Sequence, residues 1–221
     1  VVAFPSISVD LTPVLWVLAA VTMIFGNVVA IAQKNIKRLL GYSSIANGGY
    51  LMMAFVTFGN GELMDDTVSA MIFFLLGYAF TSFAAWGVVI ALEKGEAKGL
   101  ELDDYAGLGK KYPWLALAMM IAMLSFTGVP LTLGFWGKFY LFRTAVEGGY
   151  PWLALIGLLT SVVSAYYYLR VVVVTYMHPG EPQASQSFWL NLVTIGSALA
   201  VVGLSFIPGS LLYLAVQAVI R

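Results

Sequence analysis

The sequence predicts an all-α membrane protein that crosses the bilayer several times. Of its 221 residues, 61% are hydrophobic and only 10% are charged, and the mean hydropathy is +0.90. A soluble domain is about half apolar and a quarter charged, so this chain is expected to face lipid acyl chains. The apolar residues also fall into runs of the length that a bilayer-crossing helix needs, about 20 residues.

Six such runs are expected to form one transmembrane domain over residues 1–221. They lie at about 12–33, 37–57, 67–92, 113–146, 151–177 and 188–215. The segments between them carry polar or helix-breaking residues, and none could hold a soluble domain. Because the chain opens on Val1 without the basic region of a signal peptide, we expect it to be a fragment of a longer protein or to lack its beginning.

The basic residues predict how these spans are oriented, because cytoplasmic loops carry an excess of lysine and arginine. Seven of the eleven basic residues follow the first or the third span: Lys34, Lys37, Arg38, Lys94, Lys98, Lys110 and Lys111. That face is assigned to the cytoplasm, which places both ends of the chain outside. The 11 basic residues are balanced by 11 acidic ones, so nucleic acid is not expected as a partner.

The composition limits the chemistry that this chain can perform by itself. It has no cysteine and a single histidine, His178. Thiolate-bound iron–sulfur clusters, bis-histidine haem and histidine-based zinc sites are therefore excluded within this chain. We expect it to hold no cofactor, metal or redox centre.

The fourth span is too long to be one straight helix. Its 34 residues would reach ~51 Å at 1.5 Å per residue, against ~30 Å of hydrocarbon. Pro130, near the middle, lacks a backbone donor, and Gly128 and Gly134 flank it. Two half-helices joined by an unwound segment, "TGVPLTLG", are therefore expected. Broken helices of this kind mark ion sites in transporters.

Lys138 is the candidate for proton transfer. It follows the break by eight residues, and Gly134 and Gly137 leave room beside it. All eleven acidic residues fall in loops or terminal segments, so no carboxylate of this chain is expected to neutralise it within the membrane. A charge near the bilayer centre costs at least ~2.5–3.5 kcal/mol and is a functional hypothesis by default. The alternative is an interfacial lysine that snorkels to the headgroups.

Further polar residues are candidates for lining a proton path. Those expected on the third span and around the break are Tyr78, Thr81, Ser82, Ser125, Thr127 and Thr132. For the first three, ordinary hydrogen bonding between helices is the alternative. Arg170 is expected either to snorkel or to pair with a neighbour's carboxylate, beside an aromatic belt at 166–168. His178, in the next loop, is either a surface residue or a proton-entry group.

Two long stretches resemble the antiporter-like membrane subunits of NADH–quinone oxidoreductase, respiratory complex I. They are "QKNIKRLLGYSSIANGGYL" from Gln33 and "LSFTGVPLTLGFWGKFYLF" from Leu124. The resemblance implies a subunit of fourteen helices built from two inverted five-helix repeats, each with one broken helix. The six spans would be the second repeat plus the terminal helix, which makes this chain the C-terminal half of a longer subunit. The family's proton-transferring lysine lies in a "GFxGKF" pattern, here "GFWGKF", which assigns that role to Lys138 and the break to Pro130.

The function implied by this resemblance is proton translocation as a subunit of the translocase. NAD, FMN, iron–sulfur clusters and quinone would be held by partner subunits, and further antiporter-like subunits would be neighbours in a bacterial cytoplasmic membrane. The family's other key groups, a glutamate and lysines of the first repeat and middle helices, would lie upstream of Val1. Two alternatives stay open: a subunit of a multisubunit sodium/proton antiporter, which belongs to the same family, and a proton-inert membrane scaffold.

Overall fold

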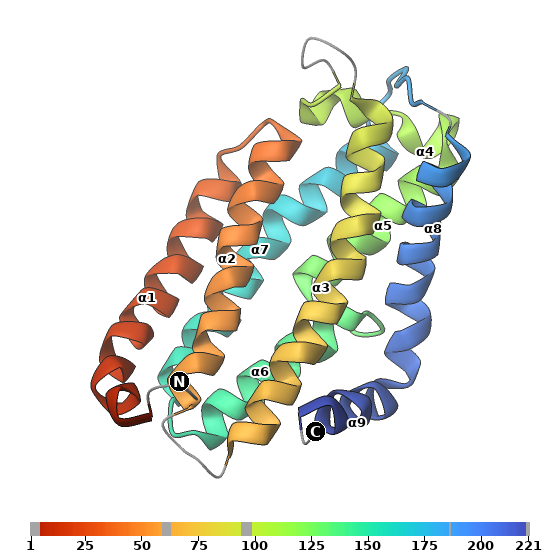
Figure 1. Ribbon diagram of the computed structural model, residues 1–221. Coiled ribbons are helices and arrows are strands. Elements are labelled where there is room, and N and C mark those ends of the chain that lie inside the picture. Colours follow the sequence, from red (N-terminus) through yellow and green to blue (C-terminus); the bar gives the residue numbers. More distant parts are fainter. Residues whose placement is uncertain (1–4, 59–62, 94–98, 186, 220–221) are drawn as a thin grey trace.

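The computed structural model describes residues 5–58, 63–93, 99–185 and 187–219, and in these ranges the chain is helical without strands. A bundle of helices makes up most of the molecule (Figure 1). In chain order the helices are α1 (Pro5–Ile31), α2 (Ile36–Thr57), α3 (Met64–Leu92), the 3₁₀ turn η3 (Leu102–Tyr105), α4 (Leu108–Lys111), α5 (Pro113–Thr127), α6 (Leu133–Glu147), α7 (Pro151–Met177), α8 (Phe188–Gly203), the 3₁₀ turn η4 (Leu204–Phe206) and α9 (Pro208–Val219).

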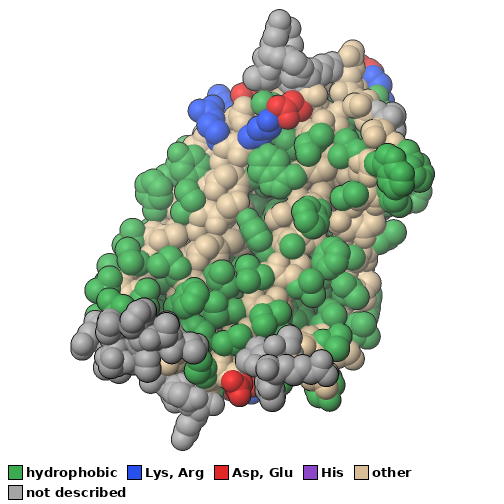
Figure 2. All heavy atoms as spheres, in the orientation of Figure 1, with side chains coloured by type: hydrophobic (Ala, Val, Ile, Leu, Met, Phe, Trp, Pro, Cys, Tyr) green, Lys and Arg blue, Asp and Glu red, His purple; other side chains and the backbone are tan. Residues whose placement is uncertain are grey.

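Four helical stretches in the described part of the chain are long and apolar enough to cross a membrane. They are Leu11–Ile31, Met64–Leu92, Pro151–Met177 and Phe188–Phe206. Figure 2 shows a broad band of hydrophobic side chains between charged groups at the two ends of the bundle. The structure therefore supports a multi-pass membrane protein. Two of the six expected spans are not among these four stretches. The span expected at 37–57 is α2, and the span expected at 113–146 is divided into α5 and α6, which have 15 residues each.

Residues 128–132 separate α5 from α6 and contain Pro130. Gly128 ends α5 in the left-handed conformation, with φ +88°, and donates its N–H to the carbonyls of Leu124 and Ser125. Leu131 also has a positive φ of 71°, which is uncommon for a residue with a side chain. At ~1.5 Å per residue each 15-residue helix reaches ~22 Å, so neither matches ~30 Å of hydrocarbon alone.

The expected last span, 188–215, differs from the structure. Helix α8 ends at Gly203, and α9 starts at Pro208 after η4 and the non-helical Ile207. The physical reason is that proline cannot donate the hydrogen bond a continuing helix needs, whereas it is well suited to a first helical position. Helix α9 consequently runs across the end of the bundle (Figure 1).

Residues of η4 contact the segment that joins α5 to α6. The hydroxyl of Ser205 donates to the carbonyl of Leu131 at 2.8 Å, and the indole N–H of Trp136 donates to the carbonyl of Ser205 at 3.1 Å. Ser205 is therefore bonded on both sides of the start of α6. This fixes the turn after α8 against the broken segment.

At the opposite end of the bundle, the connection after α3 packs on the turn between α1 and α2. Backbone bonds of 2.8 Å join Ile36 to Leu100 and Leu102 to Lys34. The α1–α2 turn and α4, which carry described basic residues expected on one face, lie at this same end (Figure 1). Lys37 pairs there with Glu93, and Lys111 pairs with Glu181.

Candidate functional site

Lys138 lies in the second turn of α6 and is only 5% exposed. Its ammonium nitrogen donates to the carbonyl of Phe126 at 2.7 Å, to the hydroxyl of Ser161 at 2.8 Å and to the carbonyl of Thr127 at 3.3 Å. An ammonium group has three donors, so each can have a partner. Among the described residues, the ion pairs do not include Lys138. Neutral oxygen atoms, rather than a carboxylate, hold this cation.

The end of α5 leaves these carbonyls available. In a continuous helix the carbonyl of Phe126 would accept the N–H of residue 130, and Pro130 has none. The carbonyl of Thr127 would accept the N–H of Leu131, which lies beyond the turn. Both carbonyls also sit at the C-terminal end of α5, where the helix dipole favours a cation. The lysine on α6 therefore completes the hydrogen bonding at the end of α5.

Glycines allow the two half-helices to approach. A side-chain carbon at Gly134 would collide with the carbonyl of Ser125, and one at Gly128 would lie 3.3 Å from Cδ of Lys138. A carbon at Gly137 would lie 3.1 Å from the ring of Phe74 on α3. The glycines predicted around the break thus mark close contacts in this structure.

Tyr50 on α2 covers another side of Lys138. The ammonium nitrogen lies 4.9 Å from the centre of its ring, a cation–π arrangement. The Tyr50 hydroxyl lies 3.4 Å from that of Thr160 on α7. Helices α2, α5 and α7 therefore each contribute a group that faces the ammonium.

Two of the predicted hydroxyl residues are joined beside the break. The hydroxyls of Thr81 and Ser125 lie 2.8 Å apart, and that of Ser125 accepts the N–H of Gly134 at 3.1 Å. A cavity of about 10 Å³ adjoins them and is lined by Asn47, Phe74, Tyr78, Thr81, Ser125, Phe126, Gly134 and Lys138. This volume is close to what a single water molecule needs.

The remaining predicted hydroxyls are placed differently. Tyr78 lines the cavity, but its hydroxyl donates to Ser44 at 2.8 Å. Thr127 and Thr132 use their hydroxyls on nearby backbone carbonyls, those of Met123 and Val129. The contact of Thr127 with Lys138 is made by its carbonyl instead.

The buried oxygen of Ser82 has no hydrogen-bond partner among the described residues. Its expected place on one face with Tyr78 and Thr81 is only partly realised, because residues 81 and 82 are adjacent and point about 100° apart on a helix. Thr81 faces the break, and Ser82 is not among the residues that line the cavity beside Lys138.

Arg170, which was expected to snorkel or to pair with a neighbour's carboxylate, is bonded within this chain. Its guanidinium donates to the carbonyl of Ile31 at 3.2 Å and to that of Gln33. Ile31 is the last residue of α1 and Gln33 lies two residues beyond it, so Arg170 joins α7 to the end of α1 and the turn that follows. His178 follows the last residue of α7 and is exposed, away from Lys138.

The predicted aromatic belt at 166–168 is wrong for two of its three tyrosines. Tyr166 is 61% exposed, whereas Tyr167 and Tyr168 are buried. Their hydroxyls bond Asn27, at 3.0 Å, and Ser43. Successive helical residues are rotated by about 100°, so three in a row cannot all face lipid.

Sequence reasoning missed a buried polar set on α1, α2 and α7. Its members are Asn27, Ser43, Asn47, Tyr50, Thr160, Ser161, Ser164, Tyr167 and Tyr168. A signal was present, because the polar residues of α7 recur at spacings of three and four and so share one helical face. Ser161, which contacts Lys138, belongs to this set.

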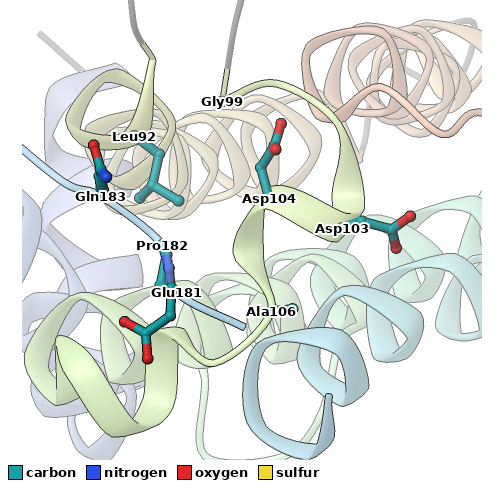
Figure 3. A pocket seen from close by; sticks show the side chains of 8 residues that line it. All are labelled: Leu92, Gly99, Asp103, Asp104, Ala106, Glu181, Pro182 and Gln183. Carbon is teal, nitrogen blue, oxygen red and sulfur yellow. The ribbon is translucent and has the colours of Figure 1, made fainter. Parts of the chain in front are cut away.

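A larger cavity of about 410 Å³ lies at the end of the bundle, lined by Asp103, Asp104 and Glu181 among others (Figure 3). Figure 3 shows the three carboxylates pointing apart. Asp104 accepts the backbone N–H of Glu101 at 2.9 Å, and Glu181 pairs with Lys111 at 3.0 Å. In the described part of the chain, no group of three histidine, cysteine or acidic residues is placed to hold a metal ion.

The fold and the site together define a multi-pass helical membrane protein with a lysine buried on α6 beside the end of α5. A family model described as "NADH:quinone oxidoreductase/Mrp antiporter, TM" matches residues 1–164. The chain belongs to this family, as its two signature stretches predict.

Curated relatives include the NADH-quinone oxidoreductase subunit N of Trichlorobacter lovleyi, 48% identical over 212 residues, covering 94% of this chain and 42% of the relative. The subunit N of Bdellovibrio bacteriovorus is 43% identical over 195 residues, covering 87% and 40%. The chain thus spans about 40% of the length of these relatives. The resemblance to subunit N, which the stretch "YYYLRVVVVTYM" also indicates, is confirmed.

Solved structures share the fold. A chain of respiratory complex I from Thermus thermophilus with bound aureothin gives a TM-score of 0.80 at 35% identity, covering 91% of this chain and 45% of that one. A chain of the Mrp complex from Dietzia gives 0.79 at 18% identity, covering 94% and 46%, which shows the fold alone.

Proposed function

We propose that this chain is part of a proton-translocating membrane subunit of NADH–quinone oxidoreductase, and that Lys138 takes up and releases the proton. The observation that carries the proposal is a buried ammonium whose three donors all meet neutral oxygens. Redox chemistry, with NAD, FMN, iron–sulfur clusters and quinone, belongs to partner subunits. The chain supplies six spans, of which α5 and α6 form one discontinuous span, with both ends outside the bacterial cytoplasmic membrane.

The neutral surroundings of Lys138 support this role. When an ammonium loses its proton next to a carboxylate, a buried anion is left behind at a large cost. Here loss of the proton leaves an uncharged amine among carbonyl and hydroxyl groups. Both states of the site are therefore free of an unpaired buried anion.

A charge on a neighbouring subunit can drive Lys138 to take up or release its proton. At an effective dielectric constant of about 20, a unit charge ~10 Å away alters the energy of the ammonium by ~1.7 kcal/mol. Since ~1.4 kcal/mol is a tenfold change in an equilibrium constant, one such charge shifts the proton affinity of Lys138 by more than tenfold. The Thr81–Ser125 pair and the adjoining cavity would order the water that carries the proton.

The test uses the full-length subunit in the assembled complex, reconstituted in vesicles. Lys138→Ala and Lys138→Arg are both expected to lose most proton pumping, because arginine keeps the charge but cannot deprotonate. NADH–quinone turnover is recorded in parallel, and Lys110→Ala, at an exposed position, is the matched control. Parent-like pumping by Lys138→Ala would make the chain a proton-inert scaffold.

A sodium/proton antiporter subunit is the second candidate, favoured by the family model, whose description includes the Mrp antiporter. The two candidates differ in the ion and in the driving reaction. Proton uptake driven by NADH in sodium-free buffer supports the first candidate. Proton movement that needs a sodium gradient and no redox substrate supports the second.

A further inference from the structure

Ser161 lies between Lys138 and the end of α5. We propose that Ser161 is a positioning residue that holds the Lys138 nitrogen in both of its protonation states. This inference rests on the proposed function, because it concerns the same proton transfer. It assigns a role to a residue of α7 that is remote in sequence from the broken helix.

The three partners of the ammonium differ in what they can do. The carbonyls of Phe126 and Thr127 can only accept hydrogen bonds, whereas the hydroxyl of Ser161 can accept and donate. In the structure the Ser161 oxygen accepts from the Lys138 nitrogen at 2.8 Å and donates to the carbonyl of Thr127 at 3.2 Å. This arrangement suits the ammonium form.

The neutral amine needs a different arrangement. When an N–H bond of Lys138 breaks and its proton leaves to a water molecule, the nitrogen keeps two N–H groups and gains a lone pair. The two N–H groups can stay on the carbonyls of Phe126 and Thr127. The lone pair then faces Ser161, whose O–H can turn from Thr127 to the nitrogen. Ser161 keeps its own proton, and each hydrogen-bonding group retains a partner.

Other polar side chains around the cavity beside Lys138 use their donors elsewhere: Asn47 donates to the carbonyl of Ser43, and the Thr81 hydroxyl donates to that of Gly77. Helix α2 presents the ring face of Tyr50, and α3 presents the Phe74 side chain, with Tyr78 lining the adjoining cavity. Tyr78 uses its hydroxyl on Ser44. Without Ser161, the lone pair of a buried amine would lose the protein donor that contacts the nitrogen, which disfavours the neutral form.

The matched control lies one helical turn away. Ser164 is also buried, at 2% exposed, and its hydroxyl donates to the carbonyl of Ser161 at 2.6 Å. No hydrogen bond joins its hydroxyl to Lys138 in the described structure. Removing that hydroxyl perturbs the same helix and leaves the donors and acceptors of Lys138 in place.

The experiment compares Ser161→Thr with Ser161→Val in the assembled full-length complex. Threonine and valine have nearly the same shape and differ in the hydroxyl. We expect Thr to retain at least half of the parent's NADH-driven pumping, Val and Ala to lose at least tenfold, and Ser164→Ala to pump like the parent. Since shape is matched, a purely structural role would not separate Thr from Val.

The outcomes separate this inference from the proposed function. If Lys138→Ala fails to pump while Ser161→Val pumps as well as Ser161→Thr, the role of Ser161 is overturned and that of Lys138 stands. If Lys138→Ala pumps normally, the proposed function itself fails. Should the larger side chains block assembly, Ser161→Ala removes atoms only, and parent-like pumping by that variant also overturns the inference.

Discussion

The side-chain nitrogen of Lys138 lies 2.7 Å from the carbonyl oxygen of Phe126, which Pro130 leaves without its usual backbone donor. The two residues belong to different half-helices, α6 and α5. The break in the backbone and the position of the cation are therefore one structural feature. Restoring a backbone donor at residue 130 should compete with Lys138 for the carbonyl of Phe126.

A double substitution, Gly128→Ala with Pro130→Ala, tests this link. It restores the N–H that residue 130 lacks, and it disfavours the left-handed turn at residue 128 by about 1–2 kcal/mol. The Phe126 carbonyl gains a competing backbone donor, so we expect at least a fivefold loss of proton pumping in complexes that still assemble. Pro151→Ala is the control, because Pro151 begins α7, where an N–H has no helical partner.

Gly134→Ala is expected to separate the half-helices. Its added carbon would collide with the backbone carbonyl of Ser125, which cannot move away as a flexible side chain could. Overpacking of this kind costs about 1–3 kcal/mol or more. We expect less assembled complex on a native gel and at least tenfold lower pumping per complex. Gly196→Ala on α8, where nothing lies within 4 Å of the added carbon, should match the parent; equal loss in both variants would contradict the prediction.

Arg170→Met is expected to destabilise the protein without directly altering Lys138. The substitution leaves the carbonyls of Ile31 and Gln33 without the donors that Arg170 supplies. These two bonds are part-buried, so their loss costs less than the ~1–3 kcal/mol of a fully buried unsatisfied carbonyl, and the melting temperature should fall by a few degrees. Arg38→Met, at an exposed position near the same end, serves as the control. A parent-like melting temperature with lost pumping would indicate a role in proton transfer instead.

Tyr105→Phe is expected to change how stability depends on pH. Burial raises the pKa of Tyr105, with the carboxylates of Asp104 and Glu93 adding to the shift, above its ordinary value of 10.0. Stability from this raised pKa is present below about pH 10 and is lost at higher pH, as the unfolded chain releases the proton.

The measurement is thermal unfolding of the purified complex at pH 8 and pH 11. The hydroxyl of Tyr105 has no hydrogen-bond partner in the described part of the chain, so the Phe variant should be no less stable than the parent at pH 8. It should lose less stability than the parent at pH 11. A parallel decline of both proteins would contradict this.

The class of fold could be predicted from the sequence because it depends on composition and on the length of apolar runs. The end of α8 could not, because the run around Ile207 stays apolar while the backbone turns into Pro208. Hydropathy cannot register a change of direction inside lipid or at its edge. Only the proline was available as a signal, and a proline also fits a kinked but continuous span.

The candidate site was predictable only in part, for a similar reason. Lys138 stands out because an amine among apolar residues is costly. The partners of Lys138 do not stand out, because two are backbone carbonyls and the third, Ser161, is an ordinary hydroxyl. Serine and threonine in membrane helices often bond their own backbone, as Thr127 and Thr132 do here. Distances were needed to tell these cases apart.

The bonds of Ser205 to Leu131 and Trp136 have a practical consequence for labelling and fusion experiments. They join the turn before α9 to both the linker and the first turn of the half-helix that carries the lysine. A probe fixed rigidly to α9 is therefore coupled through these bonds to the start of α6, which carries Lys138. A signal reported from that helix would include movements of the segment next to Lys138, and a long flexible tether is needed wherever an inert label is wanted.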